Sequence, residues 1–178
     1  RTDEQLKVVA DEIKSLGRTC VTVAADISDD NNVERVFKHT FDNFGRVDIL
    51  VNNAGIAIDG PFSEMKMEDW DQTLNVNLRG AALCAKIALC DMLKRGEGVI
   101  INIASGAGLR GLPGNAAYSA SKGGLIAMSQ AVADEVGVSG VRVNVICPGP
   151  IETEMLMQSK LRDFLLKNKE SLLPPEDI

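Results

Sequence analysis

The sequence is poor in the residues that build metal sites and disulfide frameworks. It contains one histidine, His39, and four cysteines that form neither a CxxC pair nor a closely spaced group. We therefore expect no metal site and no disulfide-stabilised secreted fold. His39 falls off the apolar stripe of its predicted helix, which favours a solvated residue. The four cysteines are Cys20, Cys84, Cys90 and Cys147.

An excess of positive charge and long apolar runs are also missing. Nineteen Lys and Arg residues stand against 25 Asp and Glu residues, a net charge of -6 without a basic cluster, so no nucleic-acid partner is expected. No apolar run approaches the roughly 20 residues that cross a bilayer, and the first residues are too charged for a signal peptide. We expect a cytoplasmic protein with no membrane partner.

Length and composition fit one globular unit. The 178 residues suffice for a single core, and 45% apolar with 25% charged residues is close to the globular average. The chain starts without methionine inside a predicted helix, and it ends at Pro-Pro-Glu-Asp-Ile without an obvious final element. We therefore expect residues 1–178 to form a single partial domain that is truncated at both ends.

Apolar residues recur with two alternating periods. Helical spacing begins after Thr2, which predicts a capping box with Gln5, and again after Ser28 or Asp29, either of which can be an N-cap. Between the helices lie short apolar runs that are typical of buried strands. This alternation predicts an α/β protein with a doubly wound parallel sheet. The predicted strands are Cys20–Ala25, Val47–Val51, Val99–Ala104 and Val141–Cys147.

Tyr118 and Lys122 are the first candidates for chemistry. They lie four residues apart in the helix predicted from Ala116 to Val136, hence on one face, and Lys122 belongs to its apolar stripe. Alone, such a pair is more often a packing tyrosine and a lysine whose ammonium reaches solvent. Two other residues favour a site. Ser105 follows a predicted strand, and Asn77 interrupts the apolar stripe of a long helix, where its amide needs partners.

The order and spacing of these residues resemble the short-chain dehydrogenase/reductase family, in its single-domain branch. The resemblance implies a Rossmann-like fold that binds NAD or NADP, and a catalytic tetrad of Asn77, Ser105, Tyr118 and Lys122. The matching motifs run nearly end to end. They are Asp26-Ile27-Ser28, Asn52-Asn53-Ala54-Gly55, Asn75-Val76-Asn77-Leu78, Ser105, Tyr118-Ser119-Ala120-Ser121-Lys122, Asn144 and Pro148-Gly149-Pro150-Ile151-Glu152-Thr153.

Cofactor contacts follow from the same resemblance. Arg1 falls just after the position of the family's second strand, where an arginine often pairs with a 2′-phosphate, and this favours NADP over NAD. The implied contacts are Asp26 and Ile27 at the adenine, Asn53, Ala54 and Gly55 along the cleft, Tyr118 and Lys122, Pro148 and Gly149, and Ile151 and Thr153 at the nicotinamide end.

Family members begin with a strand, a TGxxxGxG phosphate loop, a helix and a second strand, and none of these precedes Arg1. In the family's sheet order, 3-2-1-4-5-6-7, the two missing strands separate Cys20–Ala25 from Val47–Val51. One strand is then left without neighbours. We therefore predict function for the parent protein and inactivity for the 178-residue chain alone.

A second glycine pattern, GxGxxG at Gly106, Gly108 and Gly111, is not interpreted as a phosphate loop. Pro113 and Gly114 follow it instead of a helix, so no helix N-terminus faces a phosphate there. We interpret it as a flexible loop that carries Ser105.

The chemistry implied is hydride transfer between a nicotinamide and a carbonyl or secondary alcohol carbon. Tyr118 would move the proton, and at about 5 Å and an effective dielectric near 20 the Lys122 ammonium would lower its pKa by about two units before desolvation. Ser105 would donate a hydrogen bond to the substrate oxygen, and Asn77 would hold a water linking Lys122 to solvent. An amphipathic segment, Glu154–Lys169, is expected to cover the cleft.

The sequence leaves the substrate and some alternatives open. Its motifs look most like the 3-oxoacyl carrier-protein reductase type, although sugar and polyol dehydrogenases share nearly all of them. A small-molecule carbonyl or alcohol is therefore expected as substrate, and the apolar stretch Ala81–Leu93 favours a homodimer or homotetramer. A non-catalytic dinucleotide-binding relative is the main alternative. A serine hydrolase is disfavoured, because Ser105 lacks GxSxG and His39 precedes it.

Overall fold

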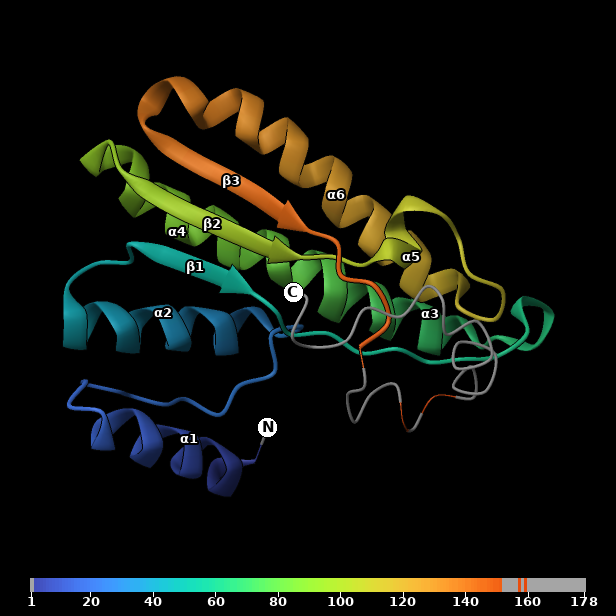
Figure 1. The fold of residues 1–178 in the computed structure, drawn as a ribbon, viewed down its shortest axis with the longest axis horizontal. Helices are drawn as coiled ribbons and strands as arrows, with labels where there is room; N and C mark the ends of the chain where they lie inside the picture. The colour runs from blue at the N-terminus through green and yellow to red at the C-terminus, as the bar shows by residue number, and fades with distance from the viewer. Residues whose placement is uncertain (1, 152–156, 158, 160–178) are drawn as a thin grey trace.

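A computed structural model describes residues 2–151, 157 and 159. Three strands form a parallel sheet in the order β1-β2-β3 (Figure 1): β1 (Ile49–Asn52), β2 (Gly98–Ile103) and β3 (Val141–Ile146). Leu50 of β1 is paired with Ile100 of β2, which is paired with Val143 of β3. All three strands thus end at the same edge of the sheet, and the α/β class expected from the sequence is confirmed.

The helices begin and end largely where local signals predict. Thr2 and Gln5 form the capping box of α1, whereas Asp29, not Ser28, caps α2, which ends at Gly45 in the left-handed conformation. No helix of the described residues is both long enough and apolar enough to cross a bilayer. The helices are α1 (Asp3–Ser15), α2 (Asp30–Phe44), η1 (Phe62–Glu64), α3 (Met67–Leu74), the π-helix η2 (Asn75–Gly80), α4 (Ala81–Arg95), α5 (Gly106–Leu109), α6 (Ala116–Val136) and η3 (Gly137–Ser139).

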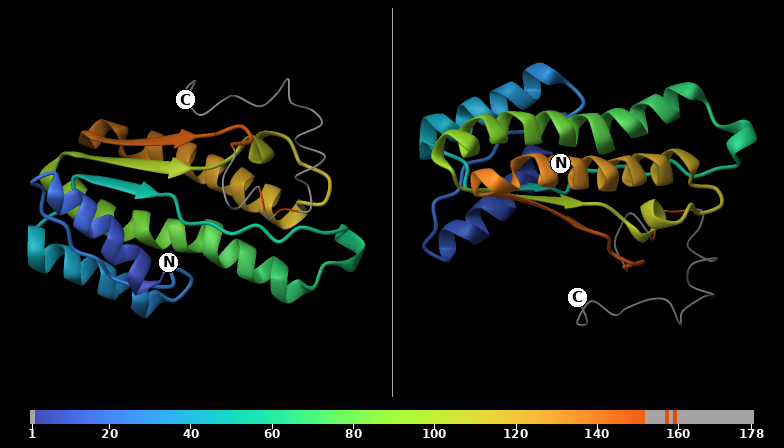
Figure 2. Two further views of the ribbon diagram at one scale, coloured as in Figure 1. Left: turned by 60° about the horizontal axis from the view of Figure 1, so that its bottom comes forward. Right: turned by 90° about the horizontal axis from the view of Figure 1, so that it is seen from above.

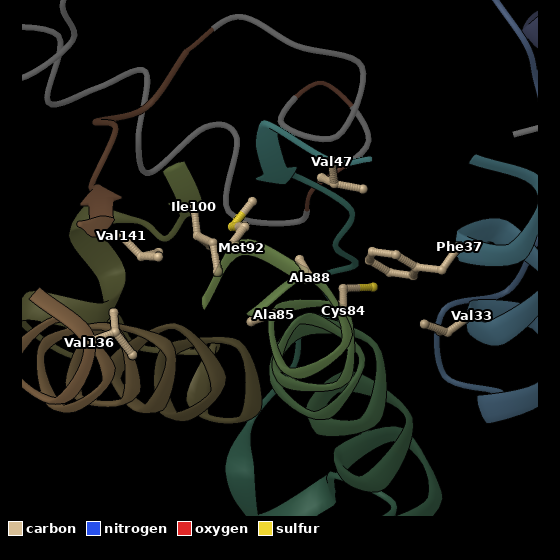
Figure 3. Packing of buried hydrophobic residues seen from close by; sticks show 10 residues of the cluster. All are labelled: Val33, Phe37, Val47, Cys84, Ala85, Ala88, Met92, Ile100, Val136 and Val141. Atoms are coloured by element: carbon tan, nitrogen blue, oxygen red, sulfur yellow. The ribbon is translucent and has the colours of Figure 1, made fainter. Parts of the chain in front are cut away.

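The main core lies between the sheet and the helices on one side of it. Helices α2, α4 and α6 lie on the same side of the strands, and α1 lies on the other (Figure 2). Met92 and Ala88 of α4 sit at the centre of this core and are fully buried. Figure 3 shows the cluster, which comprises Val33, Phe37, Val47, Cys84, Ala85, Ala88, Met92, Ile100, Val136 and Val141.

The other face of the sheet is open at β1 within the described residues. Ile49 and Val51 point away from the core side that holds Leu50, and they are 62% and 52% exposed. Ile146 of β3 lies on this same face and is 47% exposed. Apolar side chains of a β-strand are rarely left in water in a row, so this face lacks a covering layer in the part of the chain that the structure describes.

The segment Cys20–Ala25, predicted as a strand left without neighbours, has no strand partner in the described sheet and does not form a regular strand. This segment runs between α1 and α2 without regular secondary structure and joins no ladder of the described sheet (Figure 1). A strand is stable only when a neighbour satisfies its backbone groups. Here the Arg35 side chain supplies one such partner, since its Nη2 donates to the Ala24 carbonyl at 2.6 Å.

Gly140 lies between η3 and β3, and it packs against Gly96 in the turn before β2. A substitution at Gly140 therefore tests how closely these two turns pack. The φ of Gly140 is 79°, and a Cβ there would lie 2.2 Å from the Gly96 carbonyl oxygen. Gly140→Ala should lower the free energy of unfolding by about 3 kcal/mol or more, because a backbone clash adds to the cost of a left-handed alanine. Urea unfolding measures the loss.

Gly45→Ala is the matched control for this change. Gly45 has nearly the same φ, 77°, but nothing lies within 4 Å of its added Cβ. Only the conformational cost of about 1–2 kcal/mol is then expected. Equal losses for the two variants would mean that the turns at Gly96 and Gly140 separate without penalty.

Candidate active site

Asn77 sits inside the π-helix η2, which joins α3 to α4. Asn77 is 1% exposed, and its side chain forms two hydrogen bonds with the backbone of Ile56, in the segment that follows β1. Oδ1 accepts from the Ile56 backbone N at 2.8 Å, and Nδ2 donates to the Ile56 carbonyl at 2.8 Å. Nδ2 also donates to Ser121 Oγ at 3.0 Å. Both amide hydrogens are therefore used, and a water could bind this side chain only at the remaining lone pair of Oδ1.

Ser105 lies two residues after the end of β2 and caps the single turn of α5. Its Oγ accepts a hydrogen bond from the Ala107 backbone N at 3.1 Å. We expected a loop over this glycine-rich segment, and the structure differs by forming α5 there. The reason is steric: a Cβ on Gly108 would lie 2.7 Å from the Lys122 backbone carbon, so the glycine lets α5 pack directly on α6.

Tyr118 and Lys122 lie in the first two turns of α6, on the face toward the sheet. Lys122 is 4% exposed, and its Nζ donates to the Ile103 carbonyl oxygen at 2.7 Å, at the carboxyl end of β2. The same Nζ lies 5.7 Å from the centroid of the Tyr118 ring. The structure thus brings the phenol, the ammonium and the end of β2 together, as the spacing predicts.

Burial dominates the titration of both groups. It raises the pKa of the Tyr118 phenol above its ordinary value, and a hydrogen bond with Ser105 lowers this pKa in part. Burial also lowers the pKa of Lys122 to about 8. The expectation of a phenol made more acidic by its lysine is therefore not met in this structure, because desolvation by burial outweighs the hydrogen bond with Ser105.

The candidate cofactor residues follow the strand ends. Ile27, Asn53 and Ala54 line one groove of about 290 Å³, which also exposes the outer edge of β1. A Cβ on Gly55 would lie 3.2 Å from Asn77 Oδ1 and 3.5 Å from Lys122 Nζ, so this backbone passes directly over the buried amine. Asp26 lies on the loop that leads to α2.

Asp26 is held locally, and its carboxylate Oδ1 accepts from the backbone N and the Oγ of Ser28 at 2.9 and 2.7 Å. The backbone bond, then the hydroxyl, lowers the pKa of Asp26. At the other end of the site, the Pro148 carbonyl accepts from the Gly106 backbone N at 2.9 Å, which ties the chain after β3 to α5. Gly149 and Ile151 follow in sequence. Arg1, Thr153 and the segment 154–169, except Met157 and Ser159, lie outside the described residues.

Sequence reasoning missed two groups that support this site. Ser121, between Tyr118 and Lys122, is fully buried and connects Asn77 to α6. Arg79 of η2 holds the start of α2 with two hydrogen bonds to Asp30, at 2.6 and 2.8 Å. The sequence signal for Ser121 was a serine at a position where the helical pattern calls for an apolar residue.

Among the described residues no cluster of His, Cys, Asp or Glu could hold a metal ion.

Comparison with known proteins places the chain among dehydrogenases. The family model of short chain dehydrogenases matches residues 1–163. An uncharacterized oxidoreductase of Thermotoga maritima is 40% identical over 177 residues, which cover 97% of this chain and 70% of that protein. A 3-oxoacyl-(acyl-carrier-protein) reductase of Synechocystis is 44% identical over 147 residues, 83% of this chain and 60% of that protein.

A solved structure agrees with these matches. The NAD+-bound xylitol dehydrogenase superposes with a TM-score of 0.84 at 28% identity, covering 94% of this chain and 64% of that protein. The chain therefore spans between 60% and 70% of the length of these relatives. The shared part contains the strand ends and helix α6, on which the candidate residues lie.

Lys122→Met should stabilise the fold at neutral pH. A lysine whose pKa is about 8 when folded and 10.5 when unfolded binds fewer protons in the folded state between these values. Stability then rises with pH in this window, and the burial cost is fully present below pH 8. Methionine removes this burial cost but also loses the hydrogen bond to the Ile103 carbonyl. The free energy of unfolding at pH 7 should therefore increase by about 1–3 kcal/mol.

Urea unfolding at pH 7 and pH 9.5 checks this prediction, with a smaller gain expected at pH 9.5. Lys86→Met, on an exposed position of α4, is the control and should keep the pH dependence of the wild type. If the Lys122→Met variant were less stable than the wild type at pH 7, the Lys122 ammonium would make a net stabilising contribution to the free energy of unfolding, which would contradict the prediction.

Proposed function

The chain belongs to the short-chain dehydrogenase family, and on this premise we propose that the whole protein interconverts a carbonyl and a secondary alcohol with a nicotinamide dinucleotide. The observation that carries this proposal is the contact between Lys122 and Tyr118 at the carboxyl end of β2, with Ser105 beside the phenol. When bound, the dinucleotide supplies or accepts the hydride, and the protein supplies proton transfer and orientation.

Tyr118 acts as the general acid or base in this proposal. In the reducing direction its phenol donates a proton to the oxygen that becomes the alcohol, and in the oxidising direction the phenolate takes that proton back. The Lys122 ammonium stabilises the phenolate by electrostatic attraction at 5.7 Å from the ring centroid. Because burial alone raises the pKa of Tyr118, the proton transfer relies on this positive charge and on the Ser105 hydroxyl.

Ser105 has a second task in the proposal. Its hydroxyl donates to the substrate oxygen and so stabilises the negative charge that grows there in the transition state. In the structure the Ser105 Oγ accepts a bond from the Ala107 N, and its single hydrogen serves the bond that lowers the pKa of Tyr118, so donation to a substrate oxygen would replace that bond. Asn77 supports the arrangement by fixing Ile56 and α6, and it is the place where a water linking Lys122 to solvent is proposed to bind.

The residues beside Lys122 fit a nicotinamide dinucleotide. Gly55 lets a backbone lie over Lys122 Nζ, and an ammonium with a phenol one turn away offers donors for ribose hydroxyls. Ile27, proposed to contact the adenine, lines the same groove as Asn53 and Ala54, which are proposed to line the cofactor cleft. Thr153 and Ile151 remain the proposed contacts at the nicotinamide end, with Pro148 and Gly149 before them. NADP is favoured over NAD because of Arg1.

The substrate proposal rests on the relatives. A 3-oxoacyl thioester is the first choice because of the 44% identical Synechocystis reductase, and a sugar or polyol is the second because of the similarity to xylitol dehydrogenase. Oxidation of NADPH and NADH should be screened with β-keto thioesters, ketoses and aliphatic ketones. A homodimer or homotetramer is proposed, and light scattering on the whole protein would contradict it by showing a monomer.

Tyr118→Phe should abolish turnover in the whole protein while leaving dinucleotide affinity within about threefold, because only the ionisable oxygen is removed. Stopped-time assays measure kcat, and dinucleotide fluorescence titration measures the dissociation constant. Phe62→Leu, at an exposed aromatic of η1, is the control and should retain turnover. Turnover that survives in Tyr118→Phe would reject the tyrosine as the proton donor.

The 178-residue chain alone should show no saturable binding of NADH or NADPH. The open face and outer edge of β1, with Ile49 and Val51 exposed, lie beside the groove of the proposed adenine contacts. A binding site that is open to solvent on one side buries too little of the ligand surface to give high affinity. Fluorescence titration of the isolated chain checks this expectation, and a saturable signal for either dinucleotide would refute it.

A further inference from the structure

Ser121 is the buried centre of a hydrogen-bond path between three elements. Its Oγ donates to the Tyr118 carbonyl at 2.7 Å and accepts from Asn77 Nδ2 at 3.0 Å. Asn77 in turn holds both backbone groups of Ile56. The path therefore connects the chain after β1, the π-helix η2 and the turn of α6 that carries Tyr118.

Removal of the Ser121 hydroxyl would have a specific consequence. Ser121 is 0% exposed, so one amide hydrogen of Asn77 would be left without a partner in the interior. Asn77 can regain a partner only by rotating, and rotation disturbs its two bonds to Ile56. Space beside the amide is limited, because even a Cβ added at Gly55 would lie 3.2 Å from Asn77 Oδ1.

The same helix carries a second serine in the same chemical setting. Ser129, eight residues further along α6, is 2% exposed, donates to the Leu125 carbonyl at 2.6 Å and accepts from Asn102 Nδ2 at 2.9 Å. The two serines thus match in burial and in hydrogen bonds. They differ in what they adjoin, since Ser129 connects α6 to Asn102 of the central strand β2, whereas Ser121 connects Asn77 to the turn that carries Tyr118.

We propose that Ser121 is a positioning residue for proton transfer, which holds the first turn of α6, and with it the phenol of Tyr118, in fixed relation to Asn77 and Ile56. The inference rests on the proposed function of the site. It assigns to Ser121 no contact with substrate or cofactor. Its effect passes through Tyr118, whose ring lies against the charged Lys122 side chain and beside Ser105.

The first test compares Ser121→Ala with Ser129→Ala in the whole protein. Each change removes one buried serine hydroxyl, so urea unfolding should show similar losses of stability. The kcat should fall about tenfold or more for Ser121→Ala and less than about twofold for Ser129→Ala, because small displacements of an acid–base group are costly. The dinucleotide dissociation constant should stay within about threefold for both.

A second readout does not depend on activity. The whole protein is labelled with ¹³C-tyrosine, and the Tyr118 signal is identified by its loss in Tyr118→Phe. Burial raises the pKa of this phenol, so loosening the turn should shift its titration midpoint downward in Ser121→Ala, toward ordinary tyrosine. Ser129→Ala should titrate as the wild type.

The outcomes separate the two proposals. An unchanged Tyr118 titration in Ser121→Ala, or equal kcat values for the two alanine variants, would overturn the positioning role. A shifted titration in a protein that reduces no carbonyl compound would show that Ser121 holds the phenol in place, and it would reject the proposed function. If Ser121→Ala does not fold, Ser121→Cys keeps a weak donor and acceptor at that position, and a smaller loss of kcat with a smaller titration shift is expected.

Discussion

The hydrogen bond from Lys122 Nζ to the Ile103 carbonyl is the constraint on which the site depends. It fixes α6 against the carboxyl end of β2 by placing an ammonium, 4% exposed, where the strand leaves an acceptor. This one bond fixes the position of α6 and of the amine relative to the end of β2. A buried lysine that lost its hydrogen-bond partner would leave an uncompensated charge in the interior, at a large desolvation cost. Tyr118, one turn earlier, and Ser105, two residues after Ile103, are positioned by the same contact.

This constraint has an electrostatic consequence. The interior that holds Lys122 in place also lowers its pKa to about 8 and raises that of Tyr118, so each group is driven toward its neutral form. At neutral pH Lys122 is therefore still protonated, and the Tyr118 phenol beside it is neutral. A group that brings positive charge or a hydrogen-bond donor to the phenol would favour the phenolate strongly, since the surroundings offer little competing solvation.

The sequence predicts what local spacing determines and misses what distant partners determine. Caps at Thr2 and Asp29, the shared face of Tyr118 and Lys122, and three of the four strands follow from neighbours in the chain. A regular strand at Cys20–Ala25 requires a neighbouring strand, so its apolar pattern alone does not produce one. The roles of Ser121 and Gly108 also required the fold, because their partners, Asn77 and Lys122, lie 44 and 14 residues away.

The two halves of the site are held by interactions of different strength. Asn77, buried in η2, fixes the residues around Tyr118 by bonds that water cannot replace without cost. Two residues further along η2, Arg79 holds the loop of Asp26 and Ile27 through Asp30, but this ion pair is half-exposed and is therefore weak even in bidentate geometry. One short π-helix thus joins the buried residues around Tyr118 to a loop that it holds only through a half-exposed ion pair.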